Sequence, residues 1–82
     1  MLYSQNHHPT CQISILVFDN YSNHCLANIL EPLRAANDLS AQPHYRWKIV
    51  TLDGAEAVSS SGLRLGADAR LSDVGGDVLM VM

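Results

Sequence analysis

Charged side chains are scarce in this sequence, and basic ones are the scarcer kind. Charged residues make up 16% of the 82 residues, and five Lys and Arg stand against eight Asp and Glu, for a net charge of -3. The basic residues are scattered instead of forming the clusters that a nucleic-acid surface or an anionic membrane attracts. We therefore expect this segment to contact neither DNA nor a membrane by itself.

Cysteines and long apolar runs are also lacking. Cys11 and Cys25 are too few for a disulfide scaffold, so we expect reduced thiols in a cytoplasmic protein. No apolar run approaches the length of a membrane span. The first ten residues have neither the basic region nor the apolar block of a signal peptide, and none is expected.

The common signatures of catalytic and cofactor sites are missing too. The sequence has no GxSxG elbow, Walker loop or GxGxxG fingerprint, and its five glycines are too dispersed for a phosphate cradle. His7, His8 and Cys11 have a spacing loosely like that of metal ligands, but a second ligand pair is lacking. We expect no metal and no cofactor.

The sequence does contain strand and helix patterns. Residues 1–11 are polar and aperiodic, and we predict a flexible tail. The apolar run Ile13–Phe18 is typical of a strand buried on both faces inside a parallel sheet. Apolar residues then recur at helical spacing, with Ser22 or Asn23 as N-cap and an end near Ser40. Pro32 falls inside this helix, where a proline removes a hydrogen bond and favours a kink.

Shorter elements are predicted in the second half. Residues 45–52 alternate as a strand whose first half is exposed on one side, and Asp53-Gly54 indicates a turn. Three weaker elements follow, a hairpin joined by Ser59–Gly62, a helical turn within 67–74 capped by Ser72 or Asp73, and a buried apolar strand at 77–82. Strand, helix and strand in this order predict an α/β fold with a mostly parallel sheet.

One helix is too few to cover such a sheet on both faces. We therefore interpret residues 12–82 as the N-terminal part of a larger α/β domain. Asp19, Asn20, Tyr21 and Ser22 follow the first strand and lead into the helix, the position at which open α/β sheets bind ligands. Helix N–H groups there favour an anionic group, although the four residues could simply turn the chain and cap the helix. Glu31 is expected to be exposed or at an interface instead of catalytic.

Several segments together resemble a known family. The stretches ISILVFDNYSNHCLANILEPLRAAN, YRWKIVTLDG, SSSGLRLGADARLSDV and DVLMVM resemble the effector domain of a branch of AraC-family transcriptional regulators. That domain is of the class I glutamine amidotransferase-like, PfpI type. The resemblance implies a flavodoxin-like three-layer sandwich, of which only the N-terminal part is present. It also implies a small-molecule effector (an amino acid or amine), a homodimer, and DNA binding only through a C-terminal helix-turn-helix domain absent from these residues.

The resemblance leaves one alternative, a PfpI-type hydrolase such as a peptidase, amidase or glyoxalase-like enzyme. Enzymes of this fold carry an acidic residue on the first helix that hydrogen-bonds the elbow cysteine. Alignment on Leu33–Ala36 places that position at Cys25, and a thiol cannot replace a carboxylate there. We therefore expect a sensor without catalysis, whose ligand pocket includes Asp19 to Ser22 and Cys25.

Overall fold

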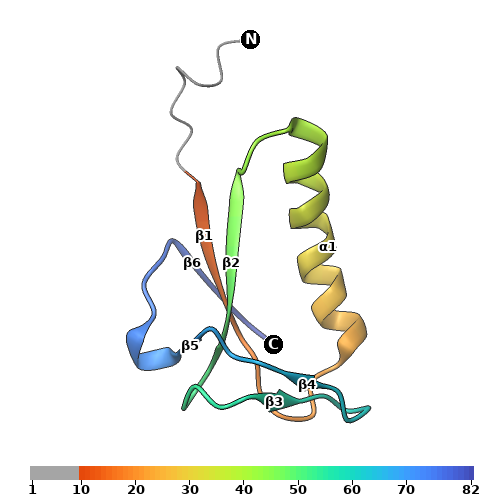
Figure 1. The fold of residues 1–82 in the computed structure, drawn as a ribbon, viewed down its shortest axis with the longest axis vertical. Helices are drawn as coiled ribbons and strands as arrows, with labels where there is room; N and C mark the ends of the chain where they lie inside the picture. The colour runs from red at the N-terminus through yellow and green to blue at the C-terminus, as the bar shows by residue number, and fades with distance from the viewer. Residues whose placement is uncertain (1–9) are drawn as a thin grey trace.

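A four-stranded parallel sheet forms the centre of the structure, a computed structural model that describes residues 10–82 (Figure 1). Its strand order is β5-β2-β1-β6, and every neighbouring pair is parallel. A separate antiparallel hairpin pairs β3 with β4. The elements in chain order are β1 (Cys11–Leu16), α1 (Asn23–Ser40), β2 (Tyr45–Thr51), β3 (Ala57–Val58), β4 (Arg64–Leu65), β5 (Ala69–Arg70), the 3-10 turn η1 (Leu71–Asp73) and β6 (Val78–Val81).

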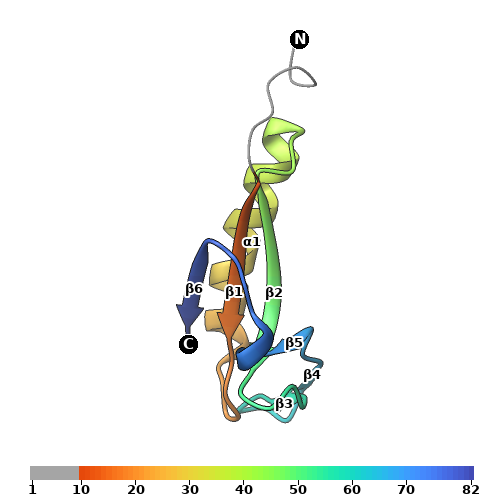
Figure 2. The same cartoon turned by 90° about the vertical axis from the view of Figure 1, so that its left-hand side faces the viewer.

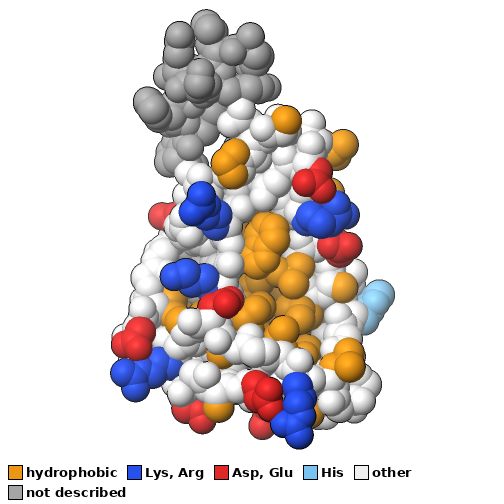
Figure 3. All heavy atoms as spheres, viewed as in Figure 1, with side chains coloured by type: hydrophobic (Ala, Val, Ile, Leu, Met, Phe, Trp, Pro, Cys, Tyr) orange, Lys and Arg blue, Asp and Glu red, His pale blue; other side chains and the backbone are white. Residues whose placement is uncertain are grey.

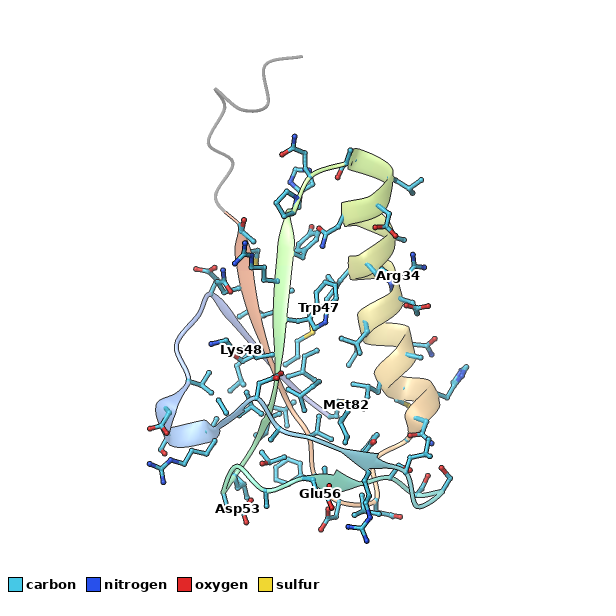
Figure 4. All side chains as sticks on the ribbon, in the orientation of Figure 1. Arg34, Trp47, Lys48, Asp53, Glu56 and Met82 are labelled. Carbon is cyan, nitrogen blue, oxygen red and sulfur yellow. The ribbon has the colours of Figure 1, made fainter. Side chains whose placement is uncertain are left out.

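The two central strands, β1 and β2, carry the core. Ile15 and Val50 are fully buried, and each of their strands has a neighbouring strand on both sides. Side chains alternate along β2, so that Trp47 points toward α1 and Lys48 points the opposite way (Figure 4). The predicted alternation of this strand is confirmed, since Arg46 and Lys48 are exposed in its first half and its last three residues are buried.

Helix α1 covers one face of the sheet and lies behind it in Figure 2. Its N-cap is Ser22, whose hydroxyl accepts the N–H of Cys25 at 3.2 Å. Its end is fixed at Ala41, which adopts a left-handed φ of 54°. Asn37 joins the end of α1 to β2, donating to the carbonyl of Tyr45 at 2.9 Å and accepting its N–H at 3.0 Å. The predicted helix is therefore confirmed from cap to end.

Two connections complete the arrangement. The β3–β4 hairpin lies at the carboxyl end of β1, below the sheet in Figure 1. The segment from η1 to β6 crosses the sheet face opposite α1 (Figure 2), where Leu71 and Val74 share a small hollow with Ser14 of β1. The α/β fold with a mostly parallel sheet, consistent with part of a flavodoxin-like domain, agrees with the prediction.

The first and last strands differ from their predictions. Strand β1 begins at Cys11, inside the predicted tail, because the N–H of Cys11 donates to the carbonyl of His44 at 2.9 Å. It ends at Leu16, and Phe18, predicted inside the strand, is 42% exposed. Residues 1–9 of the predicted tail, including His7 and His8, lie outside the described residues.

Strand β6 is exposed instead of buried. Val78, Leu79 and Val81 are 41%, 50% and 63% exposed, because β1 is the only described strand that pairs with β6. The helical turn forms at 71–73, but Ser72 and Asp73 lie inside it instead of capping it. Asp73 accepts a hydrogen bond from Nε of Arg70 at 2.7 Å instead.

Candidate functional site

An open hollow of about 560 Å³ lies at the carboxyl ends of β1 and β6, against the first turns of α1. Both strands end at the same edge because they run parallel. Met82 lies between the sheet and the beginning of α1 (Figure 4). The hollow is lined by Phe18, Asp19, Asn20, Tyr21, Ser22, Cys25, Asn28, Ile29, Val81 and Met82.

The structure brings together all five residues predicted for the ligand pocket. Asp19, Asn20, Tyr21 and Ser22 form one wall, and Cys25 continues it on α1. Asn20 has a φ of 68°, a left-handed conformation that asparagine tolerates better than most residues. The predicted capping role of Ser22 is also confirmed, so the same residue both begins the helix and lines the hollow.

The β3–β4 hairpin holds this wall through hydrogen bonds. The N–H of Asn20 donates to the carbonyl of Val58 at 2.7 Å, and the N–H of Ser60 donates to the carbonyl of Tyr21 at 2.8 Å. The carboxylate of Asp19 accepts the N–H of Val58 at 3.0 Å. Tyr21 itself is buried, at 8% exposure. The wall is therefore held at successive residues and is not a loose loop.

The lining is chiefly apolar with a few polar groups at one side. Phe18, Ile29, Val81 and Met82 supply hydrophobic surface, while amides, hydroxyls, one thiol and one carboxylate supply the polar contacts. The lining contains no Lys or Arg. A largely apolar hollow with a small number of convergent polar groups is the usual form of a small-molecule site.

Half of the lining was not predicted from sequence. Asn28 and Ile29 lie three and four positions after Cys25, so helical periodicity could have placed them on the same face of α1. Val81 and Met82 reach the hollow only because β6 pairs with β1, with Leu16 opposite Val81. That pairing leaves no local signal in the sequence.

The acidic side chains are all occupied by structural partners. Four accept from arginines: Glu31 and Asp38 from Arg34, Glu56 from Arg64, and Asp73 from Arg70. The other four accept backbone N–H groups: Asp19 from Val58, Asp53 from Ala55, Asp68 from Ile49, and Asp77 from Gln12. Only Asp19 among them lines the hollow. The site therefore has no pair of carboxylates of the kind that general acid–base hydrolysis uses.

Glu31 is exposed, as expected, and belongs to a surface ion cluster on α1. Nε of Arg34 lies 3.0 Å from Glu31, and a second nitrogen of Arg34 lies 2.8 Å from Asp38. The hydrogen bond to Glu31 first, and that to Asp38 second, raise the pKa of the Arg34 guanidinium above its ordinary value. Such exposed pairs add little to stability, and the cluster lies away from the hollow lining.

Residues 10–82 offer neither a metal centre nor a membrane-spanning helix. Within that range, no three His, Cys, Asp or Glu side chains come together as a group able to hold a metal ion. Neither does the described part of the chain include a helix with the length and apolar character needed to cross a membrane. Cys11 and Cys25 are both free thiols.

Comparison with known proteins gives a close match to one regulator. Over 65 residues, 79% of this chain, the sequence is 43% identical to the HTH-type transcriptional regulator GbdR of Pseudomonas aeruginosa, in two strains. The chain is homologous to a transcriptional regulator. It spans only 17% of the length of GbdR, so the match concerns one segment of that protein. No protein-family model matches the chain.

A solved structure supports the fold. A protein from Vibrio parahaemolyticus described as a transcriptional regulator superposes with a TM-score of 0.73, over 89% of this chain and 39% of the other. The two sequences are 14% identical, so this likeness concerns the fold alone.

Proposed function

We propose that this chain is the effector-binding segment of a bacterial AraC-family transcriptional regulator, within a domain of the PfpI type. The effector is a small nitrogenous metabolite, an amino acid or amine, and it occupies the hollow beside Asp19 to Ser22 and Cys25. The sensing domain forms a homodimer in the cytoplasm, and DNA is bound by a helix-turn-helix domain outside these residues. The chain itself catalyses no reaction.

One observation carries the proposal. The five residues predicted from sequence for the ligand pocket converge on a single hollow of about 560 Å³ at the carboxyl ends of two parallel strands. That edge is where open α/β sheets bind their ligands. Homology to an HTH-type transcriptional regulator supports sensing as the use of such a hollow.

The hydrolase alternative receives no support from the same residues. Cys25, aligned with the acidic position of related enzymes, lies on the hollow wall as a free thiol. The carboxylate of Asp19 is engaged by the N–H of Val58. The proposal of a non-catalytic sensor therefore rests on the chemistry of the side chains that line the hollow.

A thermal-shift screen of amino acids and amines on the full chain tests this proposal. A ligand that binds only the native state at a hundredfold excess over Kd adds about 2.7 kcal/mol. A domain of this size gains roughly 4–8 °C in Tm per kcal/mol. We therefore expect at least one compound of this class to raise Tm by about 10 °C or more at that excess.

A matched pair of variants locates the binding. Asn28 lines the hollow, whereas Ala27, the residue before it, is also exposed on α1 but does not line the hollow. Asn28→Leu replaces an amide that lines the hollow with an apolar group of similar shape and should reduce the ligand-induced shift, while Ala27→Leu should preserve it. The proposal is wrong if no compound raises Tm, or if Asn28→Leu responds as strongly as the wild type.

A further inference from the structure

The turn that lines the hollow also holds the β3–β4 hairpin in place. The hairpin contains only two cross-strand pairs, Ala57 with Leu65 and Val58 with Arg64. It rests against the turn through the backbone bonds of Asn20 and Tyr21 described above. A two-stranded hairpin is marginally stable by itself in water. Its order therefore depends on these attachments to the hollow wall.

Two side chains of the turn add to the attachment. Asp19 accepts the N–H of Val58 at 3.0 Å, 39 residues away in the sequence. Asn23, the first residue of α1, donates from Nδ2 to Oγ of Ser61 at 2.6 Å. Both contacts join the region around the hollow to the hairpin, one on each side of the Asn20–Ser22 turn.

The contact between Asn23 and Ser61 continues into a small network of hydroxyl groups in the hairpin loop. Oγ of Ser61 lies 3.1 Å from Oγ of Ser59. The Ser59 hydroxyl in turn accepts the N–H groups of Ser61 at 3.2 Å and Leu63 at 2.9 Å. Ser59 is buried, at 5% exposure. A change in the position of Asn23 would thus reach the whole loop between β3 and β4.

We propose that Asp19 and Asn23 are positioning residues that couple occupancy of the hollow to order in the β3–β4 hairpin. The inference rests on the proposed function, since it assumes that the hollow binds a ligand. Asp19 both lines the hollow and bonds Val58, so a ligand that fixes its carboxylate also fixes the hairpin. By thermodynamic reciprocity, loosening the hairpin weakens ligand binding by the same factor. The hairpin is then the part of the segment that reports whether the hollow is filled.

Amide exchange on the full chain, followed by NMR, tests the attachment without any ligand. Asp19→Ala removes the acceptor of a charge-assisted hydrogen bond, and we expect exchange of the Val58 and Ser60 amides to rise about tenfold or more. Asp19→Asn keeps an oxygen acceptor, so exchange of the same two amides should remain close to that of the wild type. Asp53→Ala is the matched control, because Asp53 also accepts a backbone N–H, that of Ala55 at 3.0 Å, away from the hollow lining.

The amide of Ile15 in the core reports global opening, so that local and general loosening are separated. The attachment is refuted if Asp19→Ala leaves the ratio of hairpin to core exchange unchanged, or if Asp53→Ala changes it equally.

A covalent probe tests the coupling itself and does not require the natural effector. In a Cys11→Ala background, Cys25 is the single thiol of the chain. Its thiolate displaces methanesulfinate from 2-aminoethyl methanethiosulfonate and forms a mixed disulfide. A small ammonium group is thereby fixed at the hollow wall.

Occupying part of the hollow in this way should slow hairpin amide exchange by about threefold or more, and this slowing should disappear in Asp19→Ala. The coupling would be overturned if hairpin amide exchange were the same in the modified and unmodified proteins. It would also be overturned if modification slowed hairpin exchange equally in Asp19→Ala. If the covalent probe succeeds and the thermal-shift screen finds no ligand, the coupling stands and the proposed effector class is wrong.

Discussion

At the scale of single residues, Gly76 shows how closely two segments approach. Its φ is 137°, and a Cβ there would lie 3.2 Å from the carbonyl oxygen of Gln12. This approach allows Asp77 to satisfy both backbone groups of Gln12. Its carboxylate accepts the N–H of Gln12 at 2.8 Å, and its own N–H donates to the Gln12 carbonyl at 2.9 Å. Gly76 thus permits the close approach of the two segments, and Asp77 makes the hydrogen bonds that attach the beginning of β6 to β1.

The adjacent Gly75 provides a control for this position. A Cβ at Gly75 would meet no atom within 4 Å, and its φ lies outside the left-handed range. We predict that Gly76→Ala lowers the free energy of unfolding by about 1–3 kcal/mol through backbone strain. Gly75→Ala should be neutral or slightly stabilising. Urea unfolding followed by circular dichroism measures both, and equal effects of the two substitutions would contradict the prediction.

At the scale of elements, α1 tolerates a proline that isolated helices would reject. Pro32 lies at the tenth of 18 helical positions and is exposed, yet α1 continues to Ser40. Its missing N–H removes the hydrogen bond that the carbonyl of Asn28 would otherwise receive. Leu26, Ile29 and Leu33 pack on the core on either side of it. Packing of the apolar face therefore maintains a helix that its local sequence would weaken.

Because packing maintains α1 despite the proline, we predict that Pro32→Ala stabilises the chain. A proline in a helix interior costs up to about 3 kcal/mol relative to alanine, and little packing would be lost because Pro32 is exposed. We expect the free energy of unfolding in urea to rise by about 1–3 kcal/mol. Glu31→Ala, which removes only an exposed ion pair with Arg34, should change it by less than about 1 kcal/mol. A destabilised Pro32→Ala would show that the proline contributes contacts instead of strain.

The elements also show which signals the sequence carries. Helix α1 and the β3–β4 hairpin were predictable because a cap, a period and a polar loop are local patterns. Strand β5 was not, since Ala69 and Arg70 are extended only through pairing with Val50 and Thr51 of β2. The exposure of β6 was mispredicted because an apolar run does not disclose its neighbours in the sheet.

The residues of the candidate site also fall into those that local sequence predicts and those that only tertiary pairing brings in. Asp19 to Ser22 were found from their position between a strand and a helix, and Cys25 from its place on the helix that follows. Val81 was missed because it joins them only through the parallel register of β6 on β1. The attachment of Asp19 to Val58 is equally long-range. Local sequence thus located the wall of the hollow, while its far side and its support depended on tertiary pairing.

At the scale of the whole molecule, charge is dispersed instead of gathered. Arg34, Arg64 and Arg70 are each paired with carboxylates. Arg46 and Lys48, on the exposed side of β2, make no ion pair with any residue in the range 10–82. Figure 3 shows hydrophobic side chains gathered between β2 and α1, with basic side chains separated around them. This surface does not have the continuous positive potential that steers a protein to a phosphate backbone.

The absence of a basic patch leads to a final prediction, that this chain alone does not bind duplex DNA. Two unpaired cations allow at most about two phosphate contacts, whereas DNA-binding proteins commonly make about 6–10. At about 0.15 M NaCl, the fluorescence anisotropy of a labelled duplex should remain flat up to about 10 µM protein, a concentration in the middle of the range of non-specific dissociation constants. A protein with a helix-turn-helix domain provides the positive control. A saturable, salt-sensitive rise that disappears when Arg46 and Lys48 are both changed to Ala would instead assign DNA contact to β2.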